Sequence, residues 1–359
     1  MDTGRVAKVR RYLKDKGLDA VLISNFYNIL YLTSFKTLTA NEREAYALIT
    51  QNNIYIFTDA RYQVENRQLS LKLFEPQKGL VFHLENIIRE EKLARIGFEA
   101  EDLKYIEHQV LKEHFPAVVL VPVDRAIILI REIKDTDEIK KIKSACRAGD
   151  KNFADLVKTI RTGMTEKEIA FRLEMIIKEA GNDLAFDPIV AVDANAALPH
   201  YNTKTGNGRL QNNSVLLVDF GVKKDDYISD ITRMIFMKNC PEKIMRTYEI
   251  LKKVQENTLA RIPKETQLGN LDAFCREELS KNNLPEFAHS TGHGVGLEIH
   301  EYPKIYKTIA VEKQAGQVIT IEPGVYEAGK FGMRVEDTVV ITDQGYEIMT
   351  SFSKDRLVL

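Results

Sequence analysis

The chain has 359 residues, a length that allows two domains, each with its own hydrophobic core. Its hydrophobic content of 44%, charged content of 29% and net charge of −1 give no electrostatic reason to expect a nucleic acid or an anionic membrane as partner. The charged N-terminus is followed by no apolar signal-peptide core, and no apolar stretch approaches the roughly 18–20 residues of a membrane span, so we expect a cytoplasmic protein.

The N-terminal part of the chain alternates between helical and strand patterns. Apolar residues recur at helical spacing over 6–13, and Gly17 ends this predicted helix. Strand patterns follow at 20–23, 46–49, 54–57, 95–98 and 118–121. The turn-rich residues 51–53 join the second and third of these strands into a predicted hairpin. These patterns predict an α/β domain over residues 1–125, without a chemical motif of its own.

A second section begins with a predicted helix at about Asp135, where Glu138 stands at the spacing of a capping box. Thr165 and Glu168 repeat this spacing before an amphipathic stretch. Further long helices are expected at 241–260 and 268–281, between strands that carry acidic residues. Helices that alternate with antiparallel hairpins predict an α+β domain over residues 126–359.

Two carboxylates flank a polar, turn-like stretch in this section. Asp219 ends the apolar run 215–218, and Asp230 lies eleven residues further on. The two positions are symmetric about a point between Lys224 and Asp225. With a turn at that point, Asp219 and Asp230 would face each other across antiparallel strands, with their Cβ atoms roughly 5 Å apart.

A second pair of carboxylates repeats the pattern. Glu322 ends the apolar run 318–321, and Glu336 lies fourteen residues further on, with Gly329 midway between them. A carboxylate on a strand buried on both faces is costly unless another group neutralises it. Opposed acid pairs of this kind can ligate and bridge two divalent cations roughly 3.5–4 Å apart. Solvated surface acids are the alternative, but the apolar runs lack the alternation of an exposed strand.

Three histidines lie between the acid pairs: His289, His293 and His300. Glycines around His293 would let the backbone approach a metal closely, although they also fit a flexible loop. The acid pairs favour a metal ligand at His293. Spacing alone identifies neither His289 nor His300 as a ligand or proton carrier, and His200, beside a proline, is typical of a structural histidine. Arg334 fits either a salt-bridge partner or a substrate clamp.

Five separated motifs carry the acids and His293 in one order along the chain: LVDFG at 217–221, SDITR at 229–233, GHGVG at 292–296, EPG at 322–324 and RVEDT at 334–338. They resemble the motifs of the pita-bread metallopeptidases, which include methionine aminopeptidase, prolidase and aminopeptidase P. Residues 28–33 and 58–62 resemble, more loosely, the N-terminal domain shared by prolidase, aminopeptidase P and creatinase. The resemblance implies an α/β creatinase/prolidase-like domain over 1–125, followed by an α+β pita-bread catalytic domain over 126–359.

The resemblance also implies a metal-ligand set. Asp219 would chelate one ion, Asp230 and Glu336 would bridge both, and His293 and Glu322 would complete the other. A hydroxide between two divalent metal ions would attack the scissile carbonyl, because metal binding lowers the pKa of water. Oxygen-rich ligation with one imidazole suits manganese or cobalt, with zinc as an alternative.

The same resemblance assigns roles around the substrate. His200 and His300 match histidines that hold the substrate near the scissile bond and stabilise the tetrahedral oxyanion, and Glu322 is expected among the catalytic residues. His289 and Arg334 match residues that line the same pocket. Histidine and arginine are suited to this task because both can donate to negative charge that grows in the transition state.

The expected function is hydrolysis of the Xaa-Pro bond at the N-terminus of peptides with proline at the second position, as in aminopeptidase P. Prolidase, which cuts only dipeptides, is the alternative that no motif here excludes. Methionine aminopeptidase is disfavoured because it usually lacks an N-terminal domain of this kind, and the residues 297–301 also favour an Xaa-Pro peptidase. A non-catalytic peptide-binding module is disfavoured because all five ligand positions are kept. A homodimer is expected, as in relatives.

Overall fold

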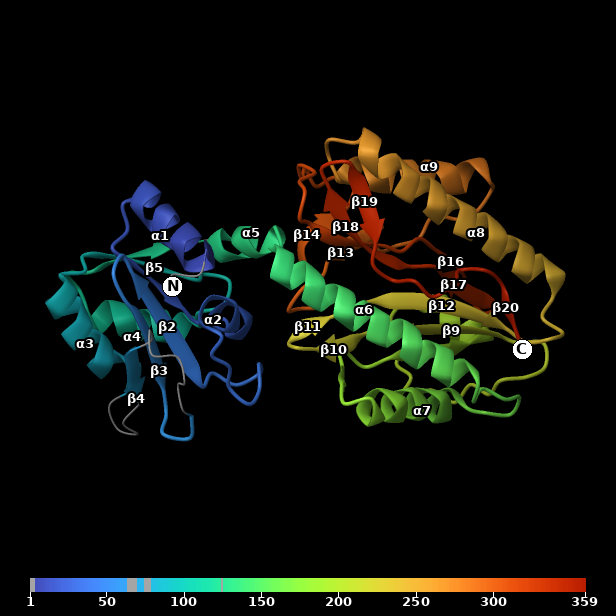
Figure 1. The fold of residues 1–359 in the computed structure, drawn as a ribbon, viewed down its shortest axis with the longest axis horizontal. Helices are drawn as coiled ribbons and strands as arrows, with labels where there is room; N and C mark the ends of the chain where they lie inside the picture. Colours follow the sequence, from blue (N-terminus) through green and yellow to red (C-terminus); the bar gives the residue numbers. More distant parts are fainter. Residues whose placement is uncertain (1–3, 63–69, 74–78, 124) are drawn as a thin grey trace. The chain divides into compact units, whose positions relative to one another are not determined.

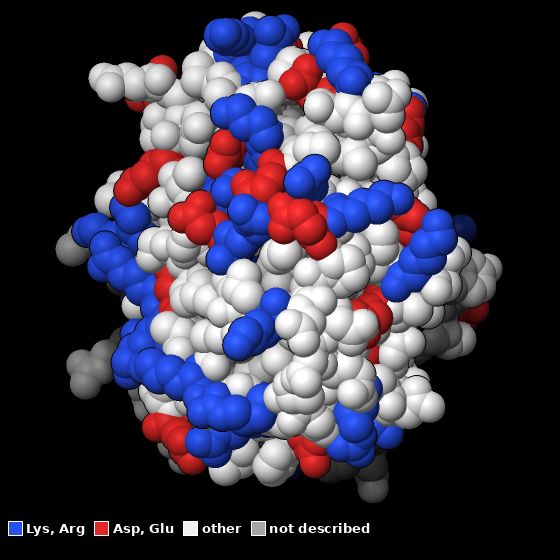
Figure 2. Space-filling view, turned by 90° about the vertical axis from the view of Figure 1, so that its right-hand side faces the viewer, with Lys and Arg blue, Asp and Glu red and all other residues white. Residues whose placement is uncertain are grey.

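The computed structural model describes residues 4–62, 70–73, 79–123 and 125–359, and the chain forms two compact units, Met1–Arg131 and Glu132–Leu359 (Figure 1). In the described part of the chain, no helix combines the length and apolar character that crossing a bilayer requires. On the face of the molecule shown in Figure 2, basic and acidic side chains lie next to one another mainly in the upper and middle part, and much of the remaining surface is uncharged.

The first unit is built on a six-stranded sheet with the order β4-β3-β2-β1-β5-β6. Its strands are β1 (Ala20–Ile23), β2 (Ala45–Thr50), β3 (Ile54–Thr58), β4 (Ser70–Leu73), β5 (Arg95–Phe98) and β6 (Val119–Pro122). Its helices are α1 (Gly4–Lys16), α2 (Phe26–Thr33), α3 (Gly79–Glu91) and α4 (Tyr105–His114), and α5 (Ala126–Glu132) follows at the division between the units. The antiparallel pairing of β2 with β3 confirms the predicted hairpin.

Side chains along each strand point alternately to the two faces of this sheet, and apolar side chains on the faces pack against helices. Ala20 and Leu22 of β1 lie in one core cluster with residues of α3 and α4, among them Leu84 and Leu111. On α1, the apolar residues at helical spacing, Val6 among them, are buried, and this helix contacts β2. The first unit is therefore an α/β domain, as expected.

The second unit combines four helices with several small sheets. The helices are α6 (Thr136–Val157), α7 (Glu166–Glu179), α8 (Glu242–Arg261) and α9 (Gly269–Lys281). The first group of strands comprises β7 (Asp183–Leu184), β8 (Ile189–Val192), β9 (Val215–Phe220), β10 (Val222–Lys224), β11 (Tyr227–Ile228) and β12 (Ile231–Phe236). The second group comprises β13 (Gly292–Gly294), β14 (Glu301–Ile305), β15 (Val318–Ile321), β16 (Gly324–Glu327), β17 (Phe331–Arg334), β18 (Asp337–Thr342), β19 (Gly345–Ile348) and β20 (Leu357–Val358). The capping boxes predicted at Asp135 and Thr165 are confirmed as the starts of α6 and α7.

Strand β9 is buried on both faces, and its alternation decides where Asp219 points. Leu216 and Val218 belong to the core cluster that includes α6 and α7. Val215 and Leu217 belong to the opposite cluster, which includes residues of β16 and β17. Asp219 shares the parity of Leu217, so its side chain lies on the face of β9 toward β17, which β9 contacts.

The first acid hairpin has a register different from the predicted one. Asp219 pairs with Thr232, and Asp230 lies in the gap between β11 and β12, so the predicted cross-strand pair of Asp219 and Asp230 is wrong. The turn is centred between Asp225 and Asp226, which have φ of 50° and 68°. A two-residue turn of type I′ needs positive φ at both central residues, and aspartate tolerates that conformation better than most residues, so the centre moves by one residue.

The second acid hairpin has the predicted register. The β15–β18 ladder pairs Ile321 with Asp337, and the β16–β17 ladder pairs Gly324 with Arg334, so both ladders are centred on the same point. Glu322 and Glu336 therefore occupy opposite positions in the gap between the two ladders. The symmetry about the turn, predicted from the sequence, is confirmed for this pair.

Candidate functional site

Asp219 belongs to a buried ion pair. Arg334 of β17 donates through Nη2 to Oδ2 of Asp219, and both residues are buried. Arg334 also donates through Nε to Oγ1 of Thr232 at 3.1 Å and through Nη1 to the hydroxyl of Tyr326 at 3.0 Å. Of the two roles considered for Arg334, the structure shows the salt-bridge partner.

Three other candidate ligands form one group. Among the residues that the structure describes, Asp230, His293 and Glu336 each offer a ligand atom, and these atoms lie within 4.8 Å of one another. Nε2 of His293 lies 3.6 Å from Oδ2 of Asp230 and 3.4 Å from Oε1 of Glu322. Asp219 stands outside this group, but its negative charge contributes to raising the pKa of Asp230 and of Glu336.

The imidazole of His293 presents a lone pair to these carboxylates. Burial and then the neighbouring His300 lower the pKa of His293 to about 3, so the ring is neutral. Nδ1 lies 3.1 Å from the backbone oxygen of Gly294, and a carbonyl can only accept, so the ring proton belongs on Nδ1. Nε2 therefore faces two carboxylate oxygens with its lone pair, an arrangement that repels unless a proton or a cation lies between them.

The buried, crowded carboxylates also need protons or cations to reduce their mutual repulsion. Burial raises the pKa of Glu322 to about 7, and burial together with the other carboxylates raises the pKa of Asp230 and Glu336 well above the usual range. In the described part of the chain, Oδ1 of Asp219 is a buried oxygen without a hydrogen-bond partner. Four carboxylates and one neutral imidazole, with a buried oxygen left open, are a donor set that fits divalent cations.

The backbone that carries Glu336 is fixed by Arg233 of β12. Its Nη1 donates to the backbone oxygens of Glu336 and Thr232, and its Nη2 donates to Oδ1 of Asp337 at 2.7 Å. Burial opposes ionisation of Asp337, but the charges of Arg233 and Lys354 outweigh it and lower the pKa of Asp337. Because Oγ1 of Thr232 also donates to Oε2 of Glu336 at 2.7 Å, both the backbone and the carboxylate of Glu336 are held.

His289 uses both ring nitrogens inside the protein. Nδ1 lies 2.8 Å from the backbone oxygen of Ser290, and Nε2 lies 2.9 Å from the hydroxyl of Tyr326. Burial is the main cause that lowers the pKa of His289 to about 4, so the neutral ring donates through Nδ1 and accepts the Tyr326 hydroxyl at Nε2. Since Arg334 donates to the same hydroxyl, His289 orients the arginine through Tyr326.

Tyr326 was missed from the sequence, although a signal was present. A Cβ atom at Gly324 would lie 2.4 Å from the Tyr326 hydroxyl, so the glycine leaves room for the phenol ring. The two residues share one face of β16, and Gly324 pairs with Arg334 across the hairpin. The glycine of the EPG motif thus leaves space for the Tyr326 ring, whose hydroxyl accepts a hydrogen bond from Arg334.

His200 and His300 are the more exposed candidates. The ring of His300 packs edge-on against that of His293, with centroids 4.5 Å apart. Loss of solvent and then the neighbouring His200 lower the pKa of His300, and His200 acts in the same sense on His289. His300 therefore lies against the candidate ligand His293, and His200 lies near His289 and His300.

Two family profiles match the chain. The profile described as Metallopeptidase family M24 matches residues 140–343, and that of the Creatinase/Prolidase N-terminal domain matches residues 5–133. The chain belongs to metallopeptidase family M24. It is therefore a peptidase, a hydrolase that acts on peptide substrates, and its family implies divalent metal cofactors.

Similarity to individual proteins extends over both units. An uncharacterized peptidase of Staphylococcus aureus (strain bovine RF122 / ET3-1) is 30% identical over 352 residues, which cover 98% of this chain and 99% of the relative. The structure of X-Pro aminopeptidase from Thermotoga maritima MSB8 matches with a TM-score of 0.88 and 30% identity over 97% of this chain and 100% of that chain. The prolidase from Pyrococcus horikoshii OT3 matches with a TM-score of 0.88 and 29% identity over 99% of this chain and 100% of that chain. These matches confirm the pita-bread fold and its creatinase/prolidase-type N-terminal domain.

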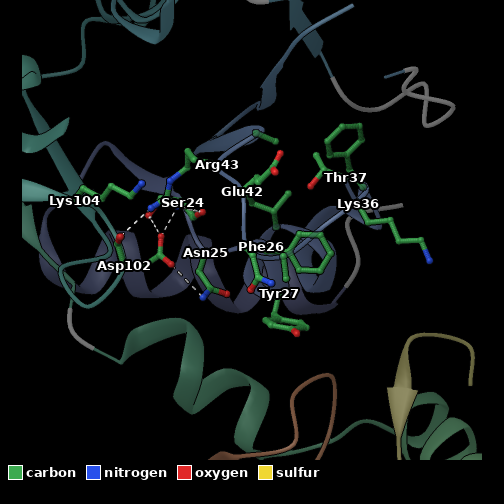
Figure 3. Close-up of a pocket in the computed structure, with 15 residues that line it drawn as sticks. Ser24, Asn25, Phe26, Tyr27, Lys36, Thr37, Glu42, Arg43, Asp102 and Lys104 are labelled. Atoms are coloured by element: carbon green, nitrogen blue, oxygen red, sulfur yellow. Dashed lines mark hydrogen bonds and ion pairs between the residues drawn. The ribbon is translucent and has the colours of Figure 1, made fainter. Parts of the chain in front are cut away.

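The first unit of this M24 peptidase contains a separate polar pocket, which Figure 3 shows beside α2. Asp102 accepts from Oγ of Ser24 at 2.7 Å and forms an ion pair with Arg43. Arg43 donates as well to the backbone oxygens of Ser24 and Asp102. These charged side chains compensate each other, unlike the crowded carboxylates of the second unit.

Proposed function

We propose that this M24 peptidase cleaves the bond between an N-terminal residue and a proline at the second position, as aminopeptidase P does. The observation that carries the proposal is the group of ligand atoms from Asp230, His293 and Glu336, with Glu322 3.4 Å from Nε2 of His293, in a chain that also carries the Creatinase/Prolidase N-terminal domain. Two divalent ions, manganese or cobalt, would be held by Asp219, Asp230, His293, Glu322 and Glu336.

Bound divalent ions would supply Lewis acidity and an activated water for attack on the peptide carbonyl. The chain's own residues would bind and orient the peptide. His300 and His200 are exposed near the candidate ligands, and an imidazole can donate an N–H to an oxygen that becomes negative in the transition state. Arg334 is held by Tyr326 and Thr232, so its charge is fixed next to Asp219.

The prolidase activity is the second candidate, because the solved structures that resemble this chain include a prolidase at 29% identity beside the X-Pro aminopeptidase at 30%. Relative rates on Xaa-Pro dipeptides and on Xaa-Pro-Yaa-Yaa tetrapeptides separate the two activities. We expect faster release of the N-terminal residue from the tetrapeptide, and loss of that release in a chelator. Cleavage of the dipeptide alone would establish the prolidase activity, and equal cleavage of Xaa-Ala-Yaa-Yaa would contradict proline specificity.

A homodimer is part of the proposal. Tyr105, Ile106 and Val119 expose 76%, 66% and 51% of their surface in the first unit, and Val119 belongs to the edge strand β6. A partner subunit that covers these apolar side chains would remove them from water. Sedimentation at the assay concentration should give the mass of two chains, and a fully active monomer would contradict the dimer.

A further inference from the structure

A buried carboxylate outside the acid cluster organises the segment that carries His200. Glu166, the first residue of α7, has no exposed surface and accepts hydrogen bonds from four neutral groups. On Oε1 the donors are the backbone N–H of Val192 at 2.7 Å and Nδ2 of Asn195 at 2.9 Å. On Oε2 they are the hydroxyl of Tyr201 at 2.8 Å and the backbone N–H of Gly208 at 2.8 Å. One side chain thus joins both ends and the middle of residues 192–208.

The segment is shaped around this carboxylate. A buried charge is costly unless hydrogen bonds satisfy it, and here each oxygen receives two. A Cβ atom at Gly208 would lie 2.4 Å from Oε1 of Glu166, and one at Gly206 would lie 2.3 Å from the Tyr201 hydroxyl. Side chains at these positions would displace the carboxylate or the phenol, so the glycines permit the close approach.

The opposite side of the segment is held by β17. A Cβ atom at Gly332 would lie 1.8 Å from the backbone oxygen of Ala196, so the segment packs directly on this strand. The backbone oxygen of Pro199 accepts from Nη1 of Arg334 at 3.4 Å. His200 therefore lies between two anchored neighbours, with Pro199 tied to Arg334 and Tyr201 tied to Glu166.

We propose that Glu166 is the positioning residue for His200, fixing the imidazole near the candidate metal ligands by holding the adjacent Tyr201. The inference deepens the proposed Xaa-Pro peptidase function and rests on it. Glu166 touches neither the acids nor the exposed histidines through its hydrogen bonds, so its effect on turnover passes through the position of residues 199–201.

The same helical turn supplies a matched control. Glu168 is exposed, and its Oε2 accepts from the backbone N–H of Thr165 at 2.7 Å and from the Thr165 hydroxyl at 3.0 Å, so it caps α7 and does not anchor the segment 192–208. Glu168→Gln changes the same charge at the same helix end. Glu166→Gln instead places an amide N–H against two of the four donors. Tyr201→Phe removes one hydroxyl from the contact and leaves the helix unchanged.

The test combines kinetics with a signal from the histidine itself. On an Xaa-Pro-Yaa-Yaa peptide, Glu166→Gln and Tyr201→Phe should lower kcat on the order of tenfold or more with metal content unchanged, since small misplacements of a catalytic group can cost about 10²-fold. In a His200→Ala background the same changes should alter kcat by less than about twofold, because coupled residues are not additive. In spectra of histidine-labelled protein, the His200 imidazole signal, assigned by its absence from His200→Ala, should shift in both variants and stay in place in Glu168→Gln.

Two results would overturn the inference. One is an equal loss of kcat in the parent and the His200→Ala backgrounds, which would make Glu166 a general structural residue. The other is an unchanged His200 signal in both variants. The spectra do not depend on activity, so an enzyme that cleaves no Xaa-Pro peptide would refute the proposed function while the position of His200 is still decided. If Glu166→Gln does not fold, Tyr201→Phe carries both measurements.

Discussion

Arg334 and Asp219 form an ion pair that uses only one of the two carboxylate oxygens. Nη2 of Arg334 donates to Oδ2, and Oδ1 lies buried without a hydrogen-bond partner among the described residues. A single oxygen therefore stays open to a cation while the guanidinium fixes the rest of the carboxylate. Arg334 is paired with Asp219 through this bond, so its single positive charge does not neutralise the other acids of the site.

Removal of Arg334 should destabilise the metal-free protein strongly. Arg334→Gln would leave Asp219 as a buried charge without its partner, a change that costs about 3–5 kcal/mol in comparable buried pairs. Bound metal should reduce this loss, because a cation then compensates Asp219. Urea unfolding in a chelator and with added manganese measures both values, with the exposed Lys330→Gln on the same hairpin as the control. Equal losses under the two conditions would contradict a cation at Asp219.

Glu336→Gln should reduce bound metal and activity together while the fold stays intact. A neutral amide cannot bridge two cations, whereas the hydrogen bond from Thr232 to the side-chain oxygen can persist. Elemental analysis and circular dichroism on the sample used for kinetics give the result. Glu327→Gln removes an acid of the same hairpin that pairs with Lys330, and it should change neither quantity. Full activity of Glu336→Gln with two ions bound would end the bridging role.

His300→Ala should keep its metal and lose most of its turnover. His300 contacts the ring of His293 and is not part of the group of ligand atoms, so we expect it to be needed only after the metals are in place. A donor that works mainly on the transition state contributes on the order of 10²–10³ in rate. Parent turnover in the variant would make His300 merely structural. Loss of metal would place it among the ligands instead.

The metal-free protein should lose stability as the pH rises through the range in which Glu322 titrates. Burial raises the pKa of Glu322 from 4.5 to about 7, so the folded state keeps a proton that the unfolded state releases. The contribution of Glu322 to the free energy of unfolding therefore falls as the pH rises from about 4.5 to about 7, by on the order of 3 kcal/mol. Urea unfolding in a chelator, compared between the parent and Glu322→Gln at each pH, isolates this contribution. Parallel curves for the two proteins would rule it out.

Local sequence patterns determined several of the helices and strands and one of the two acid hairpins. The capping boxes at Asp135 and Thr165, and the apolar runs of β9 and β15, depend on neighbours within a few residues, and these were predicted correctly. The spacing of Glu322 and Glu336 about Gly329 is likewise a local property of one hairpin. The order of the five motifs then identified the family, because the chemistry of a metal site fixes the residue types that carry it.

Tertiary structure decided the contacts between residues that lie far apart in the chain. The turn at Asp225 and Asp226 moved Asp219 opposite Thr232, since the choice between neighbouring turn centres depends on positive φ values that several polar residues tolerate. The link from His289 through Tyr326 to Arg334, and the hold of Glu166 on the segment with His200, join residues whose separation in the chain carries no periodic signal. The sequence thus predicted which residues form the candidate site, and packing between segments determined how each is oriented, because orientation depends on hydrogen bonds between residues far apart in the chain.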